Sequence, residues 1–275
     1  MRFTLLFLFF SVSIYSQIIV SGKAIDKQTN EGIPYVSIGI MGKAVGTVSD
    51  EKGNFSITLK NATDTDILKI SAIGYGAVTY KISEAKNFLN KSFYLSPQSI
   101  NLAEVAVKPQ KTVTKVLGNK KYNKNVYCNF QGIDSSYLGV EAAIRAKNKP
   151  GREVWIEDFN FFINKNTLKD SVMFRLNFYA KNEKDMPGEN ILKEPIVFKT
   201  GIKYGIVHLD LKSYLIHTNK DFFISLECLT ENVKQDLSFS GAIKGPSYFK
   251  MATFADWEKM PLMGLDFNVT VTYQK

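Results

Sequence analysis

Few residues of this chain carry the side chains that most enzyme chemistry uses. The 275 residues include two histidines, His208 and His217, and two cysteines, Cys128 and Cys228. Neither histidine begins an H-E-x-x-H helix motif, so the sequence offers no zinc-protease ligand set. No G-x-S-x-G turn marks a nucleophilic serine. We therefore expect no catalytic residue, no metal site and no cofactor, and we predict that the protein is not an enzyme.

The two cysteines leave two alternatives open. Cys128 and Cys228 both lie in β-like runs, 100 residues apart. In an oxidising compartment they could form a disulfide, which the chain-entropy model values at up to about 4.7 kcal/mol. Alternatively, both remain buried thiols that pack as small apolar residues. We favour the buried thiols.

Two pairs of acidic residues lie close to aromatic residues, namely Glu157 with Asp158 and Asp256 with Glu258. A glycosidase needs two carboxyl groups about 5–10 Å apart across a cleft. Acidic residues in strands are more often solvated side chains at strand edges. The second interpretation is the one we adopt, and a hydrolase stays a minor alternative.

Four aromatic residues are candidates for stacking on sugar rings, because glycan-binding sandwiches expose aromatic side chains on one face. An aromatic residue in a strand is more often part of the core. The four candidates are Trp155, Tyr248, Phe249 and Trp257.

The first residues resemble an export signal. Arg2 precedes the apolar run of residues 3–10, and small polar residues follow up to Ser16. This order predicts a signal peptide of residues 1–16 with cleavage after Ser16. The run is shorter than the roughly 20 residues that cross a bilayer. No cysteine follows it before Cys128, so we expect an exported protein that is periplasmic, outer-membrane-associated or secreted, and not a lipoprotein.

Residues 17–107 predict a small β-sandwich. Short alternating runs are separated by turns at roughly 8–12-residue spacing, as in antiparallel sandwiches. Phe55, Ile57 and Leu59 alternate with polar residues and so give one apolar face. Asp50 and Gly53 have the chemistry of a tight turn.

This segment resembles the carboxypeptidase-regulatory-like domain, a transthyretin-like or prealbumin-like β-sandwich common in exported proteins of Bacteroidetes-type bacteria. The resemblance lies in SGKAIDKQTNEGIPYVSIGIMGKAVGTVSDEKGNFSI and LKISAIGY, and residues 102–107 resemble the strand that closes the domain. It implies a folding or interaction accessory, not carboxypeptidase activity. The matching positions are Gly22, Asp26, Pro34, Val36, Gly46, Thr47, Asp50, Gly53, Phe55, Gly74 and Tyr75.

The positive charge is concentrated in residues 108–124. The chain has a formal net charge of +9, yet residues 17–107 and 125–275 are each almost neutral. We interpret residues 108–124 as a solvated connector. It could contact an anionic envelope surface, whereas we expect no nucleic acid partner for an exported chain. The connector contains six lysines and no acidic residue: Lys108, Lys111, Lys115, Lys120, Lys121 and Lys124.

Residues 125–275 also predict strands. In residues 172–179, Phe174, Leu176 and Phe178 alternate with Arg175 and Asn177. About eight strands fit a jelly-roll-like sandwich, and the segment loosely resembles modules appended to the same regulatory-like domain. We therefore expect an all-β protein with two sandwiches, and we predict an exported, non-catalytic binding or assembly protein of the bacterial cell envelope. The alternatives are a glycan-binding protein, a small outer-membrane barrel and a hydrolase.

Overall fold

The computed structural model describes residues 18–98, 112–129, 138–231, 233, 236–243 and 245–274. The predicted signal peptide, the predicted closing strand of residues 102–107, Lys108 and Lys111 lie outside these residues. Within them the regular elements are strands, apart from one short helix and one 3₁₀ turn. The predicted all-β class is therefore confirmed. None of these helical segments is long and apolar enough to cross a membrane.

The amino-terminal sandwich consists of two small sheets. One sheet has the order β4-β1-β7, and the other has the order β3-β2-β5-β6. The elements are β1 (Ile18–Asp26), β2 (Ser37–Ile40), β3 (Gly46–Val48), β4 (Asn54–Leu59), β5 (Ile67–Ser71), β6 (Val78–Lys81), α1 (Ile82–Ala85) and β7 (Lys91–Leu95).

The alternating sequence explains how this sandwich fills its core. Phe55, Ile57 and Leu59 of β4 are buried in one apolar cluster between the two sheets. At the turn before β4, the Asp50 carboxylate accepts hydrogen bonds from the backbone N–H groups of Lys52 and Asn54, both at 2.8 Å. The predicted turn is thus stabilised by its own aspartate, as expected for this residue type.

The carboxy-terminal sandwich contains larger sheets. One has the order β13-β12-β17-β10-β19-β20, with β14 also on β12; the other has the order β21-β18-β11-β22-β8, with β15 and β16 on β11 and β9 on β18. The elements are β8 (Thr112–Gly118), β9 (Asn123–Asn129), β10 (Glu141–Ala146), β11 (Val154–Asn166), β12 (Val172–Lys181), β13 (Pro187–Asn190), β14 (Ile196–Thr200), β15 (Gly205–Asp210), η1 (Lys212–Tyr214), β16 (His217–Thr218), β17 (Phe222–Cys228), β18 (Leu237–Ala242), β19 (Ser247–Lys250), β20 (Glu258–Met260), β21 (Gly264–Leu265) and β22 (Asn268–Gln274).

The core of this sandwich lies between the two large sheets and is rich in phenylalanine. On β12, Phe174, Leu176 and Phe178 point into it and are fully buried. Because successive side chains of a strand point to opposite faces, the intervening residues Arg175 and Asn177 lie on the other face of the same sheet. That outer face carries Arg175 and Asn177 of β12, Ser225 and Glu227 of β17 and Glu141 of β10, beside a small apolar cluster of Ala143, Phe223 and Tyr248.

The lysine-rich connector is partly a strand, which corrects its interpretation as a solvated linker. Residues 112–118 form β8, which pairs with β22 from Gly118↔Asn268 to Thr112↔Gln274. Leu117 is buried in the large core, whereas the Lys115 side chain is exposed. Like charges therefore do not keep this stretch unpaired, because the strand directs the lysine to solvent while its apolar neighbour is buried.

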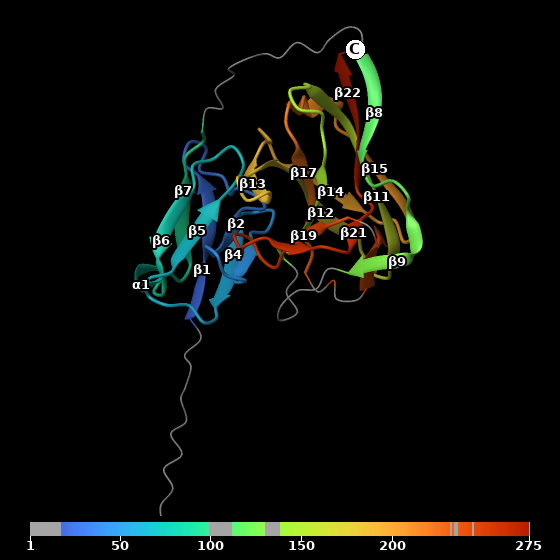
Figure 1. Ribbon diagram of the computed structural model, residues 1–275. Coiled ribbons are helices and arrows are strands. Elements are labelled where there is room, and N and C mark those ends of the chain that lie inside the picture. The colour runs from blue at the N-terminus through green and yellow to red at the C-terminus, as the bar shows by residue number, and fades with distance from the viewer. Residues whose placement is uncertain are drawn as a thin grey trace, which may run out of the picture.

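The two sandwiches lie side by side, as Figure 1 shows, with β2 and β13 on the sides that face each other. Hydrogen bonds connect them, and in one of these the Gly42 N–H donates to the Phe254 carbonyl at 2.9 Å. The outer polar face of the β12–β17–β10–β19 sheet contacts the amino-terminal sandwich. It is therefore an interface between the sandwiches.

Candidate functional site

Four charged residues form one row across the outer face of the large sheet. The register places Arg175 opposite Glu227, Glu227 opposite Glu141, and Glu141 opposite Lys250. These residues come from β12, β17, β10 and β19 in that order, and we call them the charge row. Like charges directly opposite each other destabilise a sheet. The two central glutamates therefore need partners on both sides.

Each glutamate of the charge row has a cation of its own. The Arg175 guanidinium donates to both oxygens of Glu227, at 2.7 and 2.8 Å. The Lys250 ammonium lies 2.6 Å from a Glu141 carboxylate oxygen. Arg175 and Glu227 are 7% and 3% exposed, and Glu141 is fully buried. Such bidentate, charge-assisted bonds are among the stronger ones in proteins.

Neutral side chains satisfy the remaining oxygens of the two glutamates. The Asn177 amide donates to Glu141 at 2.9 Å and to Glu227 at 3.2 Å, so it bridges the two carboxylates. The hydroxyl groups of Ser225 and Tyr179 donate to Glu141 at 2.7 and 2.8 Å. The like-charged pair is thus separated by hydrogen-bond donors.

These contacts set the protonation states. Burial alone raises the pKa of Glu141, but the Lys250 ammonium and the bonds from Ser225 and Asn177 outweigh it and hold the pKa below its ordinary value. Burial and the two neighbouring carboxylates raise the pKa of Tyr179 well above its ordinary value. Glu141 is therefore a carboxylate and Tyr179 a neutral phenol near neutral pH.

Arg175 also connects the two sandwiches. Its guanidinium donates to the backbone carbonyl of Tyr35 and to the Ser37 hydroxyl, each at 2.7 Å. Tyr35 precedes β2 and has a φ of +54°, an uncommon and strained conformation for a residue with a side chain. The side chain of Tyr35 bonds Glu51, which in turn pairs with Lys199 of β14.

A second contact depends on two glycines. The Thr253 hydroxyl donates to the Ile38 carbonyl of β2 at 2.7 Å. A Cβ atom added to Gly46 would lie 2.4 Å from the Thr253 hydroxyl oxygen, and one added to Gly39 would lie 2.8 Å from the Thr253 carbonyl oxygen. Gly39 and Gly46 therefore allow the Thr253 loop to approach β2 and β3 closely.

Beside the charge row a cleft of about 430 Å³ opens between the two sandwiches. Trp257 lines it and packs edge-on against Tyr179, with ring centroids 5.7 Å apart, while the Lys250 ammonium lies 4.8 Å from the Trp257 ring centroid. We call this hollow the interdomain cleft. Its other lining residues include Ser37, Lys69, Arg175, Asn177, Glu189, Asn190, Glu227 and Phe254.

The four aromatic candidates do not form one exposed platform. Trp155 is 4% exposed on β11 and stacks on His217, and Tyr248 is 2% exposed. Phe249 packs against the large core and lines another hollow with Met251. Only Trp257 lines the interdomain cleft. The structure therefore brings one of the four candidates to the charge row.

The acidic and histidine candidates are engaged elsewhere. Glu157 is buried and accepts a bond from Thr272, and Asp158 accepts from Asn160 and from the Thr270 backbone. His208 bonds Asn160 at 2.8 Å. His217 bonds Glu153 at 2.5 Å, and Asp256 and Glu258 are exposed. No cluster of three or more metal-binding side chains occurs among the described residues.

Both cysteines are free thiols in this structure, and both are buried. Cys128 lies on β9 and Cys228 on β17, which belong to different sheets of the carboxy-terminal sandwich. Burial raises the pKa of Cys128 to about 11 and that of Cys228 to about 12. The thiols therefore behave as core residues, the alternative that the sequence favours.

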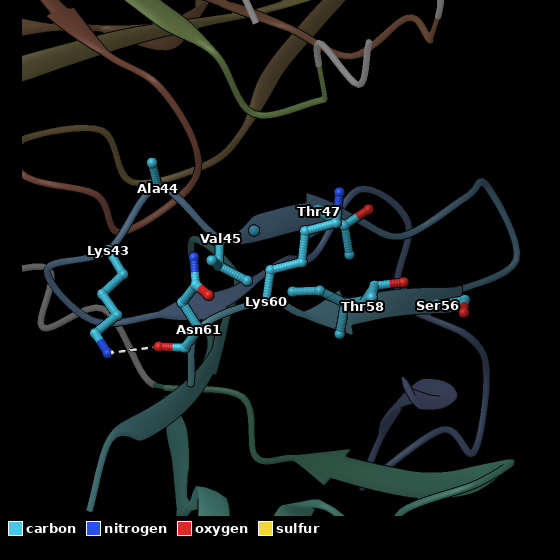
Figure 2. A pocket seen from close by; sticks show the side chains of 10 residues that line it. Lys43, Ala44, Val45, Thr47, Ser56, Thr58, Lys60 and Asn61 are labelled. Carbon is cyan, nitrogen blue, oxygen red and sulfur yellow. Dashed lines mark hydrogen bonds between the residues drawn. The ribbon is translucent and has the colours of Figure 1, made fainter. Parts of the chain in front are cut away.

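Another hollow, of about 550 Å³, lies at the β3 and β4 edge of the amino-terminal sandwich and is shown in Figure 2. Lys43 and Asn61 lie at one end of it, where the Lys43 ammonium bonds the Asn61 carbonyl and pairs with Asp66 at 2.6 Å. Among the described residues, no imidazole, thiol or carboxylate lines it. It offers less chemistry than the interdomain cleft.

Comparison with known proteins bears on the amino-terminal sandwich. Residues 20–107 match the CarboxypepD_reg-like domain family. This confirms the resemblance found in the sequence, and the match spans less than half of the chain. The CarboxypepD_reg-like domain is non-catalytic in itself. No curated protein matches the chain.

Two solved structures show only weak likeness. The structure of infectious bursal disease virus Gt strain is 6% identical, with a TM-score of 0.27, over 94% of this chain and 62% of that chain. The D431N mutant VP2 protein of the same virus is 7% identical, with a TM-score of 0.19, over 93% and 57% of the two chains. This chain thus spans about three fifths of the length of these two proteins. A likeness this weak does not establish a shared fold.

Reasoning from sequence did not identify the charge row. Its members lie on four strands that are far apart in the chain, and Glu141 and Lys250 stand in runs with no motif. One signal was present: Arg175 interrupts the apolar alternation of residues 172–178. An arginine on the outer face of a strand is normally solvated. The burial of this face becomes visible only in the structure, where the amino-terminal sandwich covers it.

Proposed function

We propose that this chain is an exported, non-catalytic binding or assembly protein of the bacterial cell envelope. In this proposal, the CarboxypepD_reg-like domain is fixed against the carboxy-terminal sandwich, and the interdomain cleft is the binding surface. The observation that carries the proposal is the charge row, in which Arg175 bonds both its own sheet and the amino-terminal domain. The predicted bounds of the signal peptide, residues 1–16, and of the amino-terminal domain, residues 17–107, are part of the same proposal.

The state of the two central glutamates favours binding over hydrolysis. A glycosidase needs one carboxylic acid whose pKa is raised so that it can donate a proton. Here the pKa of Glu141 is lowered, and its carboxylate is bonded to Lys250, Ser225, Asn177 and Tyr179. Glu227 accepts hydrogen bonds from Nε and Nη2 of Arg175. We therefore assign these groups to holding the cleft in shape.

Export and envelope location rest on the sequence. The apolar run after Arg2 and the small residues before Gln17 support a cleaved signal peptide. The lysines of residues 108–124 support contact with an anionic surface. The mass of the secreted protein tests the first point. A mature form that begins at Gln17 is expected, and a form that retains Met1 would contradict export by this signal.

Binding by the cleft is tested by cosedimentation with envelope fractions of the producing bacterium. The assay uses about 0.5 M NaCl, because salt at this level screens contacts between exposed charges. We expect wild-type protein in the pellet and Trp257→Ala in the supernatant. Trp155→Phe is the control, since Trp155 lies outside the cleft. Equal retention of all three proteins, or none, would contradict a binding role for the cleft.

Glycan binding is the second candidate function, and Trp257 favours it because aromatic rings beside amide and carboxylate groups suit sugar hydroxyls and ring faces. Two treatments of the envelope fraction separate it from assembly with a protein. Periodate, which cleaves vicinal diols, abolishes binding if the ligand is a glycan. Protease treatment abolishes it if the partner is a protein.

A further inference from the structure

A further hollow, of about 600 Å³, lies between β8 and the segments around β10 and β20. We call it the cationic groove. Four of its lining residues are basic, and among the described residues no carboxylate lines it. The basic residues are Lys115, Arg145, Lys147 and Lys259.

An edge strand and two glycines with positive φ line the groove. β8 pairs only with β22 among the described strands, so its other edge faces the groove. Gly118 ends β8 with a φ of +96°, and a Cβ atom there would lie 2.4 Å from the Phe267 carbonyl oxygen. Gly245, with a φ of +99°, has no atom within 4 Å of an added Cβ and leaves the rim open. The hollow is thus fixed by backbone.

Three of the four cations are available to a ligand. Lys115, Lys147 and Lys259 are exposed, and none of them forms an ion pair within the part of the chain that the structure describes. Lys259 acts on Asp185 only at longer range. Arg145 differs, because its guanidinium lies 2.6 Å from Asp221 and 3.5 Å from Asp185.

We propose that the cationic groove binds an acidic polysaccharide through the ammonium groups of Lys115, Lys147 and Lys259. The three ammonium groups along a concave channel fit a polysaccharide that bears one carboxylate per repeat. Its sugar hydroxyl groups can form hydrogen bonds with the exposed backbone at Gly118 and Gly245. A membrane would require a flat or convex basic surface. Single-stranded nucleic acid would require exposed aromatic rings, and Tyr248, the aromatic residue of the lining, is 2% exposed.

This proposal rests on the proposed binding function but uses another surface. None of the three lysines lines the interdomain cleft, and Trp257 does not line the cationic groove. A negative binding result at the interdomain cleft therefore does not decide the test of the cationic groove, and the reverse also holds. Lys115 lies on β8, Lys147 directly follows β10, and Lys259 lies on β20. Among the described lysines of the predicted connector, Lys115 is the one that lines the groove.

The test measures binding of the full mature chain to fluorescein-labelled oligogalacturonate by anisotropy, at low salt and at about 0.3 M NaCl. The groove variant is Lys115→Gln/Lys147→Gln/Lys259→Gln. A control variant with the same loss of charge is Lys27→Gln/Lys81→Gln/Lys169→Gln, three exposed lysines outside the groove. Circular dichroism confirms that both variants fold.

We expect wild-type binding that weakens with salt, at least a tenfold loss in the groove variant and less than a twofold loss in the control. Equal losses in the two variants would overturn the proposal, because net charge alone would then explain binding. Absence of wild-type binding would overturn it as well. Tighter binding to phosphatidylglycerol vesicles than to oligogalacturonate, lost in the same groove variant, would assign the surface to a membrane and also overturn it.

Discussion

At the scale of single residues, Arg175 contacts both sandwiches. Its guanidinium makes four hydrogen bonds, two to Glu227 and one each to Tyr35 and Ser37. A lysine could not reproduce this geometry, because only the planar fork of arginine donates in parallel to both carboxylate oxygens. Because both side chains are buried, removal of either one leaves the other charge without its counterion in a site that water does not reach.

Removal of one member of this pair is expected to cost more than removal of both. Arg175→Met leaves Glu227 buried without its cation, a change that costs about 3–5 kcal/mol in comparable pairs. In Arg175→Met/Glu227→Leu most of that loss is recovered. Urea denaturation of the two variants and the wild type measures the difference. If the free energy of unfolding of Arg175→Met lay within about 1 kcal/mol of the wild-type value, the pair would not be buried in solution.

We expect Glu141 to make the folded protein less stable in acid. Its pKa in the folded protein lies below the ordinary value, so its contribution is complete above the unfolded pKa of about 4.3 and is lost as the pH falls through the folded pKa. Urea midpoints measured from about pH 7 down to pH 3 should fall more steeply in the wild type than in Glu141→Gln. Glu31→Gln, an exposed control, should keep the wild-type slope. Identical slopes in all three proteins would refute this role of Glu141.

The two thiols are expected to react only after unfolding. With pKa values of about 11 and 12, buried Cys128 and Cys228 stay protonated at pH 8, and the thiolate is the reactive form. Ellman's reagent should titrate two thiols in urea without reductant and react slowly with the native protein. A count of zero thiols in urea would demonstrate a disulfide instead.

At the scale of elements, the sequence predicts strands better than it predicts what covers them. The alternation of β12 and β4 was readable because apolar side chains repeat every second residue. The lysines of β8 misled the interpretation, because charge on an exposed strand face looks the same as charge on a linker. The burial of the outer face of β12 was not predictable, since it depends on contacts between Arg175 and residues about 140 positions earlier in the chain.

The close approach of β2 and β3 to the Thr253 loop gives a prediction at this scale. Valine favours strand conformation more than glycine does. In Gly46→Val, however, the Cβ atom would lie 2.4 Å from the Thr253 hydroxyl oxygen. We expect faster hydrogen exchange at the Thr253 loop and at the Gly42 amide, with the two apolar cores unchanged. Gly76→Val is the matched control, because its Cβ has no neighbour nearer than 3.6 Å. The same exchange rates in both variants would argue against the docked arrangement.

At the scale of the whole molecule, the described residues form one large apolar core in each sandwich, and polar contacts join the two sandwiches. One core lies within the CarboxypepD_reg-like domain and the other between the large sheets. A small third cluster of Ala143, Phe223 and Tyr248 lies on the outer face of the large sheet. The contacts between the two sandwiches are mainly hydrogen bonds and ion pairs from Arg175, Thr253 and Lys199. The interdomain cleft exists only while these contacts hold, so a fixed arrangement of the sandwiches is the central claim.

Small-angle X-ray scattering from residues 17–275 tests this claim most directly. Because the charge row is buried, salt should not screen it as it screens exposed pairs. The account predicts a scattering curve that matches the side-by-side arrangement in Figure 1, with the same maximum dimension at about 0.05 and 1 M NaCl. A maximum dimension that grows with salt, or a curve that requires an ensemble of separated sandwiches, would contradict it.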